Sequence, residues 1–300
     1  MFKAKKALGQ NFISDPYIIE RIVDASQVGP FDTVVEIGPG KGALTCSLAE
    51  RARRVIAVEL DSSVIPLLKG NLAGAENVQI YNEDILKFDW SKALEGLGEP
   101  DAAGQGVLRV IGNLPYYITT PILLGILEKD IPAKSITVMV QKEVADRIVA
   151  PPGGRDRGVL SLSLQYYAEC SKVLDVPAEY FDPRPKVDSA VVHMVLKEQR
   201  LLAGAEEKDF FAVVKAAFSQ RRKTLLNSLA ASGLRLGGCA EGQSIQQSAQ
   251  EAIAAGTACC PVISKSRAAE VLAAVGIDPQ RRPETLEIAE FAALTKALRA

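Results

Sequence analysis

Short apolar strands alternate with amphipathic helices through the first half of this 300-residue chain. The clearest strand is the β-branched, apolar stretch 33–37 (TVVEI), which has the character of a buried parallel strand. Further strands are expected at 54–60, 78–81, 107–111 and 136–140. Helices are expected between them at 43–51, 62–72 and 120–127. Strands joined by helices form parallel sheets through right-handed crossovers. The pattern therefore predicts a Rossmann-like, doubly wound α/β sheet.

The second half of the chain loses this alternation. Its expected elements are two helices, two strands and then four helices, at 142–149, 159–168, 172–176, 189–196, 209–218, 222–231, 266–275 and 284–298. The strand at 189–196 is a candidate to close the sheet at an edge. We therefore expect an α/β domain over 1–199 and a smaller all-helical C-terminal domain over 200–300. A Gln-, Ala-, Ser- and Gly-rich insertion is expected at about 237–264.

A glycine-rich turn, 38–42 (GPGKG), follows the first buried strand and comes directly after Glu36-Ile37. Ligands of doubly wound sheets bind outside the carboxyl ends of the strands, and glycines such as Gly38 let a ligand approach the backbone closely. The spacing E-x-G-x-G-x-G differs from the G-x-G-x-x-G of dinucleotide sites. It suits a ligand without a pyrophosphate, such as S-adenosylmethionine. An ordinary tight strand–helix turn is the alternative.

One acidic residue closes the next expected strand, and another follows the strand after it. Glu59 lies 21 residues after Gly38, a distance at which an acid typically accepts hydrogen bonds from ribose hydroxyls. A role in capping the next helix is the alternative for Glu59, although Asp61 is better placed for it. Asp84 follows the strand 78–81 and can accept from the exocyclic amine of a cofactor adenine. A solvated loop acid is the alternative there.

The segment 112–117 (GNLPYY) ends the fourth strand and carries the sharpest chemical signal in the chain. The lone pair of an adenine exocyclic nitrogen is delocalised into the base, so the nitrogen is a poor nucleophile. Acceptors around its N–H groups, the Asn113 side-chain oxygen and the Leu114 carbonyl, would stabilise the charge that develops as a methyl group arrives. Tyr116 can stack on the base. A proline-containing turn with core aromatics is the alternative.

Five segments of the chain, in order over about residues 5 to 235, carry a resemblance to one enzyme family. They are 8–13 (LGQNFI), 35–40 (VEIGPG), 111–116 (IGNLPY), 180–189 (YFDPRPKVDS) and 218–223 (FSQRRK). Through them the chain resembles the KsgA-type (RsmA) small-subunit ribosomal RNA adenine dimethyltransferases. The loop 96–106 and the insertion at about 237–264 depart from the family pattern.

The resemblance implies an activity and a set of residue roles. The activity is S-adenosylmethionine-dependent N6,N6-dimethylation of two adjacent adenosines near the 3′ end of small-subunit ribosomal RNA, coupled to subunit biogenesis. The helical domain would recognise the RNA or the ribosome. Phe181 would stack on the target base opposite Tyr116, with a core aromatic as the alternative. Six residues would contact the cofactor: Asn11, Ile13, Gly38, Glu59, Asp84 and Asn113.

The charge balance places a limit on how RNA is bound. Lys and Arg number 35 against 36 Asp and Glu, so no global basic footprint attracts nucleic acid. Local clusters must then contact the phosphates. The candidates are Arg221, Arg222 and Lys223; Arg147, Arg155 and Arg157; Lys3, Lys5 and Lys6; and the smaller pair Arg281 and Arg282. Ordinary solvated helix faces are the alternative. We expect shape recognition of a pre-ribosomal 30S-type particle, with the target adenosine unstacked.

Composition also excludes several classes of protein. His193 is the only histidine, so a histidine-based triad or a multi-histidine metal centre is disfavoured. The five cysteines follow no ligand or disulfide spacing, which indicates a reducing compartment and no metal. No apolar run approaches the roughly 20 residues of a membrane helix. We expect a soluble, cytoplasmic, monomeric protein.

Several alternative functions stay open beside the family reading. Large-subunit methyltransferases of the macrolide-resistance type share an Asn-x-Pro-Tyr motif, but Leu114 and the segment 180–189 favour the small-subunit enzyme. A DNA adenine methylase would need a target-recognition domain, for which the chain has little room. An assembly factor that uses methylation as a secondary checkpoint is an alternative from a different class. A nicotinamide-dependent dehydrogenase is excluded by the glycine spacing.

Overall fold

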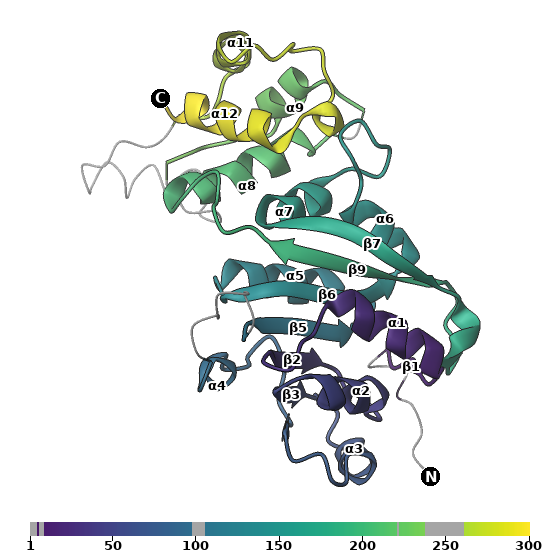
Figure 1. Cartoon of the computed structure of the whole chain (residues 1–300). Helices are drawn as coiled ribbons and strands as arrows, with labels where there is room; N and C mark the ends of the chain where they lie inside the picture. Colours follow the sequence, from purple (N-terminus) through teal and green to yellow (C-terminus); the bar gives the residue numbers. More distant parts are fainter. Residues whose placement is uncertain (1–4, 6–8, 98–105, 221, 238–260) are drawn as a thin grey trace. The chain divides into compact units, whose positions relative to one another are not determined.

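The computed structural model describes residues 5, 9–97, 106–220, 222–237 and 261–300 (Figure 1). The chain divides into two compact units, of which the first comprises 1–149 with 167–197 and the second comprises 150–166 with 198–300. The sequence-based boundary at residue 199 differs from this division in the stretch 150–166, which groups with the helical unit. The reason lies in the packing of Tyr166, which no sequence period reveals.

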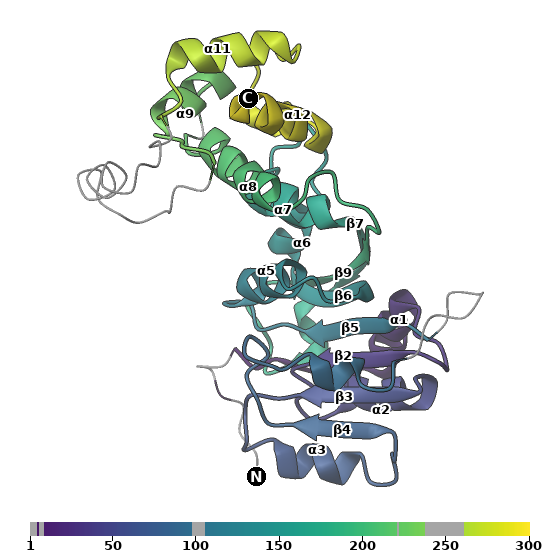
Figure 2. The ribbon, with the colours of Figure 1, turned by 90° about the vertical axis from the view of Figure 1, so that its left-hand side faces the viewer.

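A seven-stranded sheet with the order β4-β3-β2-β5-β6-β9-β7 forms the first unit (Figure 2). The first five strands of that order run parallel, and β9 pairs antiparallel with both β6 and β7. This arrangement confirms the doubly wound α/β sheet. The strand bounds are β2 Thr33–Ile37, β3 Arg54–Val58, β4 Val78–Tyr81, β5 Leu108–Asn113, β6 Ala133–Gln141, β7 Ala168–Val176 and β9 Ser189–Leu196.

The expectation that the strand 189–196 closes the sheet at an edge is wrong. β9 lies inside the sheet, and its first six residues are all buried. The edge strand is β7, in which only the first and last residues are buried and which carries a register shift between Lys172 and Leu174. Both strands are short and apolar in part, so the sequence did not distinguish the interior strand from the edge strand.

Helices and a second, two-stranded sheet complete the first unit. Helix α1 begins at Pro16, where the Asp15 side chain accepts from the Ile18 N–H at 3.0 Å. β1 (Phe12–Ile13) pairs antiparallel with β8 (Phe181–Asp182), an element that the sequence did not predict. A 3-10 turn, η2 (Ala178–Tyr180), precedes β8. The helices are α1 Pro16–Ser26, α2 Ala43–Arg51, α3 Ile65–Asn71, α4 Ser91–Leu94, α5 Thr119–Glu128 and α6 Lys142–Ile148.

The second unit is helical and has an aromatic core. The Tyr166 ring at the end of α7 lies 4.7 Å from that of Phe210 between centroids, and its hydroxyl donates to the Leu202 carbonyl at 3.0 Å. Phe210 in turn contacts Phe291 edge-on at 6.5 Å. These contacts tie residues 150–166 to this unit. Its helices are α7 Val159–Tyr167, α8 Ala205–Ala217, α9 Leu225–Ala231, α11 Lys265–Ala274 and α12 Ile288–Arg299, and a 3-10 turn, η3, spans Pro283–Thr285.

The last helix begins later than its sequence pattern predicts. The expected helix starts at residue 284, whereas α12 starts at Ile288 because Glu287 and Glu290 form a reciprocal capping box that defines the end. Most of the expected insertion, 238–260, lies outside the described residues. Among the helices that are described, none has the length and apolar character to cross a bilayer.

Candidate active site

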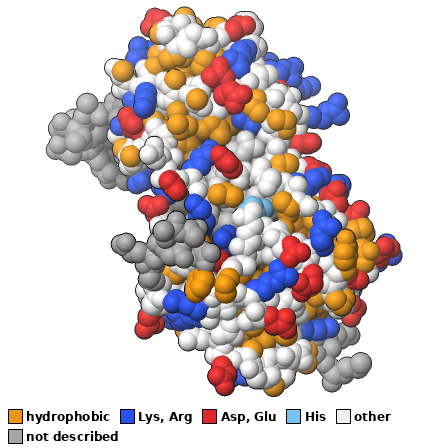
Figure 3. All heavy atoms as spheres, viewed as in Figure 1, with side chains coloured by type: hydrophobic (Ala, Val, Ile, Leu, Met, Phe, Trp, Pro, Cys, Tyr) orange, Lys and Arg blue, Asp and Glu red, His pale blue; other side chains and the backbone are white. Residues whose placement is uncertain are grey.

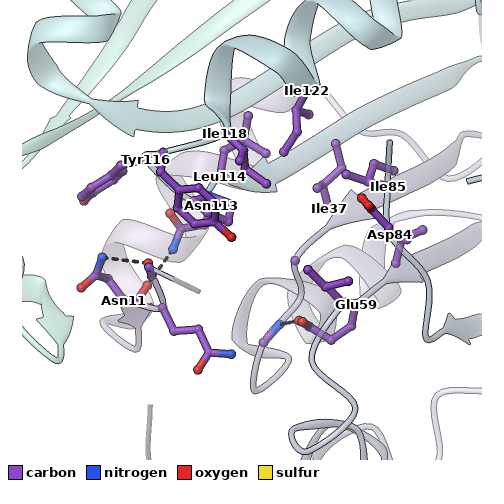
Figure 4. Close-up of a pocket in the computed structure, with 18 of the residues that line it drawn as sticks. Asn11, Ile37, Glu59, Asp84, Ile85, Asn113, Leu114, Tyr116, Ile118 and Ile122 are labelled. Carbon is purple, nitrogen blue, oxygen red and sulfur yellow. Dashed lines mark hydrogen bonds between the residues drawn. The ribbon is translucent and has the colours of Figure 1, made fainter. Parts of the chain in front are cut away.

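A cleft opens at the carboxyl ends of β2, β3 and β5 in the first unit (Figure 4). β2 lies between β3 and β5, so the strand order reverses direction at β2. Doubly wound sheets bind their ligands at such a point. The cleft has a volume of about 780 Å³ including solvent at the mouth, a size typical of small-molecule sites. It contains seven predicted site residues: Asn11, Gly38, Glu59, Asp84, Asn113, Leu114 and Tyr116.

The glycine turn at the bottom of the cleft needs its glycines for space and for backbone conformation. Gly38 has φ of 67° and Gly40 has φ of 56°, values that side-chain-bearing residues rarely adopt. A Cβ atom on Gly40 would lie 2.7 Å from the Phe12 ring. The Gly38 N–H donates to the Val58 carbonyl at 3.0 Å, which ties the turn to the end of β3. The turn therefore presents bare backbone to the cleft.

Glu59 is fixed by the backbone around it. One carboxylate oxygen accepts from the Gly40 N–H at 3.0 Å, and the other accepts from the Asp61 N–H at 2.8 Å. Burial raises the pKa of Glu59, and these backbone hydrogen bonds oppose that rise. A carboxylate has about four lone-pair sites, so acceptor capacity remains for hydroxyl donors in the cleft.

Asp61 does not cap the following helix as the sequence indicated. Helix α3 begins at Ile65 after Val64, and no side chain caps it. The Asp61 carboxylate instead accepts from Ser63 and from two residues near the N-terminus. The chain reverses in a turn over 61–64, where the Val64 N–H donates to the Asp61 carbonyl at 3.1 Å. Because this turn comes before the helix, α3 begins at Ile65 and not directly after Asp61.

Asp84 lies at the opposite wall of the cleft from the Asn113 strand end (Figure 4). It follows β4 and sits beside Ile85, which is buried. The Asn82 amide donates to the Glu59 carbonyl at 2.7 Å and so joins the exits of β3 and β4. One Asp84 oxygen accepts from the Leu86 N–H at 3.0 Å. The acid is thus held at the cleft with acceptor capacity left over.

The orientation of the Asn113 amide follows from its hydrogen bond. Its nitrogen donates to the Asn11 backbone carbonyl at 2.8 Å (Figure 4). Only the NH₂ end of an amide can donate to a carbonyl, so the side-chain oxygen is the end that remains as an acceptor. The Leu114 N–H donates to the Met139 carbonyl at 3.1 Å, which fixes the following peptide against β6. The Asn113 oxygen at this strand end is thereby left as an acceptor, and the Leu114 carbonyl belongs to the residue whose N–H is bound to β6.

Close packing explains the glycine before this motif. A Cβ atom on Gly112 would lie 2.7 Å from the Ile37 carbonyl oxygen. The strand ends of β2 and β5 can therefore approach only with glycine at this position. Gly112 is visible in the sequence, but its role could be recognised only once β2 and β5 were known to be neighbours.

Tyr116 forms a wall of the cleft and is anchored from a distant strand. Its hydroxyl lies 2.7 Å from the Ser189 hydroxyl, at the start of β9. Burial raises the pKa of Tyr116, so the phenol stays neutral at physiological pH. The ring is therefore available for stacking while its hydroxyl is held by Ser189.

Two predicted site residues do not line the cleft. Ile13 and Phe181 are 7% and 5% exposed, face each other in the β1–β8 pair, and belong to the hydrophobic core of the first unit. Ile13 lines a smaller neighbouring cavity that also includes Gly38 and Asn113. Phe181 lines neither cavity. Because β1 and β8 are two-residue strands far apart in sequence, their pairing was not predictable.

Glu36 is a buried acid whose chemistry the sequence analysis did not assign. It is 1% exposed, lines the smaller cavity, and has one carboxyl oxygen without a hydrogen-bond partner. Burial raises its pKa to about 8, the nearby Glu59 charge adds to the rise, and the Thr45 side chain opposes it. A carboxyl group left unsatisfied beside the glycine turn is a place where a positively charged ligand group is favoured. The sequence feature that could have identified Glu36 as a site residue was its position just before the glycine turn.

The predicted RNA-contacting cations belong to both units. Arg147 lies on α6 in the first unit, half exposed and 4.0 Å from Glu143. Arg222 and Lys223 are exposed in the second unit, and Arg221 lies outside the described residues. Arg157 is buried and donates to the Ala150 and Leu286 carbonyls, so its expected place in a surface cluster is wrong. Positive and negative side chains are interspersed over the face in Figure 3.

Within the parts of the chain that the structure describes, no three or more His, Cys, Asp or Glu side chains come together as a metal site. His193 is buried between β6 and β7, where its Nδ1 atom lies 2.8 Å from the Thr137 hydroxyl. The histidine is therefore a core residue remote from the cleft lining.

Comparisons with known proteins agree with this geometry. The sequence profile of a family described as "Ribosomal RNA adenine dimethylase" matches residues 1–241. "Ribosomal RNA small subunit methyltransferase A" of Alkaliphilus oremlandii is 43% identical over 297 residues, covering 99% of this chain and 92% of the relative. The protein of the same name from Bacillus cytotoxicus is 42% identical over the same coverage.

Solved structures show the same fold at lower sequence identity. A dimethyladenosine transferase from Plasmodium falciparum has a TM-score of 0.72 and 24% identity, covering 94% of this chain and 95% of that one. The 23S rRNA methyltransferase ErmE has a TM-score of 0.66 and 24% identity, covering 97% and 100%. As the five sequence motifs predicted, the chain belongs to the ribosomal RNA adenine dimethylase family.

Proposed function

We propose that this enzyme dimethylates N6 of two adjacent adenosines near the 3′ end of small-subunit ribosomal RNA, within a pre-ribosomal 30S-type particle in the cytoplasm. Membership of the family makes the chain an S-adenosylmethionine-dependent ribosomal RNA adenine dimethylase. The choice of the small subunit is supported by the names of its relatives. The observation that carries the chemistry is the Asn113 amide, whose hydrogen bond to Asn11 leaves its oxygen as an acceptor.

The cofactor fits the residues of the cleft. When bound, S-adenosylmethionine supplies an electrophilic methyl group on a positively charged sulfur. The bare backbone at Gly38 gives room for close approach, and Glu59 has acceptor capacity for ribose hydroxyls. Asp84 is proposed to accept from the adenine amine. Asn11 lines the cleft directly, whereas Ile13 would act from the smaller cavity behind the glycine turn.

The proposed chemistry rests on acceptors rather than on a general base. The Asn113 oxygen and the Leu114 carbonyl would accept from the N–H groups of the target nitrogen and stabilise its developing positive charge. The methylated ammonium is acidic enough to lose its proton to water, so no residue of shifted pKa is needed. Catalysis is then mainly an effect of orientation for in-line transfer.

The target base is proposed to stack on Tyr116, whose ring forms a wall of the cleft. Phe181 is proposed for the opposite face of the base. Because Phe181 is 5% exposed and paired with Ile13, this contact needs the β1–β8 pair to shift and expose the ring. Tyr116 therefore supports the proposal directly, and Phe181 supports it only through that movement.

RNA binding is assigned to cations of both units. Arg147 on α6 and the cluster Arg221, Arg222 and Lys223 are proposed to contact phosphates, which give affinity without sequence information. With a net charge of −1, such contacts must be local. We therefore propose that a monomer recognises the shape of the assembled particle.

The test compares three substrates in parallel. Transfer of labelled methyl groups would be measured with unmethylated small subunits, large subunits and naked small-subunit RNA. We expect label in the small subunits, less in naked RNA and none in large subunits. Asn113→Ala should lose the transfer, and Asn227→Ala, an exposed amide that bonds only locally to Thr224, should keep it. Label in large subunits would contradict the proposal. An inactive wild-type enzyme would instead favour an assembly factor.

A further inference from the structure

We propose that Asp61 is a positioning residue that fastens the N-terminal segment along the cleft, and through that segment orients the Asn113 amide. The residues involved are Lys5, Gln10 and Asn11 on one side and Asp61 on the other. The inference rests on the proposed function for the role of Asn113 but assigns Asp61 a role that the function itself does not require. Asp61 does not itself line the cleft.

The Asp61 carboxylate is a buried acceptor with donors from two distant parts of the chain. Its side chain is 1% exposed. One oxygen accepts from the Lys5 ammonium at 2.7 Å and from the Ser63 hydroxyl at 2.6 Å. The other oxygen accepts from the Gln10 amide nitrogen at 2.8 Å. A buried carboxylate is stable only when its lone pairs are satisfied in this way, so the segment and the acid depend on each other.

The Gln10 side chain binds at both of its ends. Its nitrogen donates to Asp61, and its oxygen accepts from the Lys5 backbone N–H at 2.8 Å. Gln10 is therefore held in one amide orientation, with the main chain at Lys5 folded back toward it. Gln10 is thus bound to Asp61 through its amide nitrogen and to Lys5 through its oxygen.

The position of Gln10 affects the geometry of the cleft through the residue that follows it. Gly9, Gln10 and Asn11 all line the cleft. Asn11 is the next residue after Gln10, and its carbonyl accepts from the Asn113 amide at 2.8 Å. Because that hydrogen bond alone decides which end of the Asn113 amide remains as the acceptor, a displaced Asn11 would leave the amide free to rotate. Asp61 therefore acts on Asn113 through two side-chain contacts and one peptide.

Asp61 also contacts the acid proposed to bind the ribose. Its backbone N–H donates to Glu59 at 2.8 Å, and the other Glu59 oxygen accepts from Gly40. The same residue thus fixes Glu59 through its main chain and the N-terminal segment through its side chain. Burial alone would raise the pKa of Asp61, but the hydrogen bonds from Lys5, Ser63 and Gln10 outweigh burial and hold the pKa well below its usual range.

A purely local role of Asp61 in its turn predicts a different outcome. Ser63 donates to Asp61 through both its N–H and its hydroxyl, so the acid also stabilises the turn 61–64. Ser63→Ala removes only the hydroxyl contact within the turn. Gln10→Ala leaves the turn intact and removes the contacts of the Gln10 side chain to Asp61 and to the Lys5 backbone N–H. The two variants are therefore matched, since each leaves Asp61 in place and deletes one of its donors.

The test measures cofactor binding and transfer separately in the full-length chain. S-adenosylhomocysteine binding would be measured by titration calorimetry, and the rate of methyl transfer at saturating S-adenosylmethionine would be measured for wild type, Asp61→Asn, Gln10→Ala and Ser63→Ala. We expect Asp61→Asn and Gln10→Ala each to raise the Kd and lower kcat by about ten-fold, the loss of one charge-assisted hydrogen bond. Ser63→Ala should change both by less than about two-fold. The double variant Asp61→Asn/Gln10→Ala should be no worse than Asp61→Asn alone, because both act through one contact.

Two results would overturn the proposal. One is a Gln10→Ala enzyme with the Kd and kcat of wild type, and the other is a Ser63→Ala enzyme that loses as much as Gln10→Ala. If Asp61→Asn does not fold, Gln10→Ala and Lys5→Gln still decide the question, since both keep the acid. S-adenosylhomocysteine binding needs no RNA, so an error in the proposed substrate would leave the binding result interpretable.

Discussion

The two halves of the cleft are built in different ways. In the half proposed for the cofactor, Glu59 accepts hydrogen bonds from backbone N–H groups only 19 and 2 residues away, at Gly40 and Asp61. In the half proposed for the base, Asn113 is oriented by Asn11, 102 residues away, and Tyr116 by Ser189, 73 residues away. The part of the cofactor half that contains the glycine turn and Glu59 is thus assembled within one βαβ unit. The base half exists only when the whole first unit is folded.

This difference predicts which step of the reaction each half controls. Backbone donors at the cofactor half hold its carboxylates whether or not the base half is intact. Side chains at the base half depend on contacts that a single substitution removes. Changes at the first should therefore alter cofactor affinity, and changes at the second should alter the rate of transfer at saturating cofactor.

The largest effect is expected for Asn113→Ala. The substitution removes an acceptor aimed at the charge that develops on the target nitrogen, so single-turnover methyl transfer should fall by ~10²- to 10³-fold. The affinity for S-adenosylhomocysteine, measured by calorimetry, should fall much less. A variant with transfer within ten-fold of wild type would break the proposed assignment of the base half.

The next effect concerns stability and comes from Glu36 in the cofactor half. Its folded-state pKa of about 8 lies above the ordinary 4.5, so its contribution is fully present below that ordinary value and is lost as pH rises through about 8. Without ligand, the free energy of unfolding of wild type should fall by about 2–3 kcal/mol relative to Glu36→Gln between pH about 5 and about 7. Urea unfolding of both proteins measures this, and equal pH slopes would contradict the buried, unpaired state of Glu36.

Glu59→Gln should separate binding from transfer. The amide cannot accept from both Gly40 and Asp61 while also accepting from ribose, and it brings a donor toward N–H groups. The Kd for S-adenosylhomocysteine should rise by about 10- to 30-fold, with kcat at saturation changed by less than about three-fold. If kcat falls as strongly as affinity, the cofactor half also controls the rate of transfer, and the two halves of the cleft are not independent.

Ser189→Ala should give the smallest effect. It removes the partner of the Tyr116 hydroxyl but leaves the ring in place, so kcat for transfer should fall by only about three- to ten-fold. Cofactor affinity should be unchanged in the same calorimetric assay. Tyr116→Phe should have a similar effect and should not add to it, because both substitutions remove one hydrogen bond. Additive losses would mean that Ser189 acts on the base half by another route.

The same contrast explains how much the sequence could predict. The buried strand 33–37 and the strand 78–81 coincide with β2 and β4, and the glycine turn and Glu59 could be identified because their signals are local. The Asn-Leu-Pro-Tyr motif was evident as a motif, but the orientation of Asn113 was not, since it depends on the Asn11 carbonyl.

The errors also involve contacts between distant segments. The interior position of β9 depends on which strands pair with it, and the place of Phe181 depends on the β1–β8 pair. Asp61 looked like a helix cap because two of its donors, Lys5 and Gln10, lie more than 50 residues away. The late start of α12 depends on a local capping box that was present in the sequence and overlooked.

The proposed substrate and product are best tested by identifying which nucleotides become methylated. Small subunits methylated by the wild-type enzyme would be digested, and the RNA fragments would be analysed by mass spectrometry. We predict two methyl groups on N6 of each of two adjacent adenosines near the 3′ end, and none when Asn113→Ala replaces the wild type. Methylation elsewhere in the small-subunit RNA, or on adenosines of the large subunit only, would contradict this prediction.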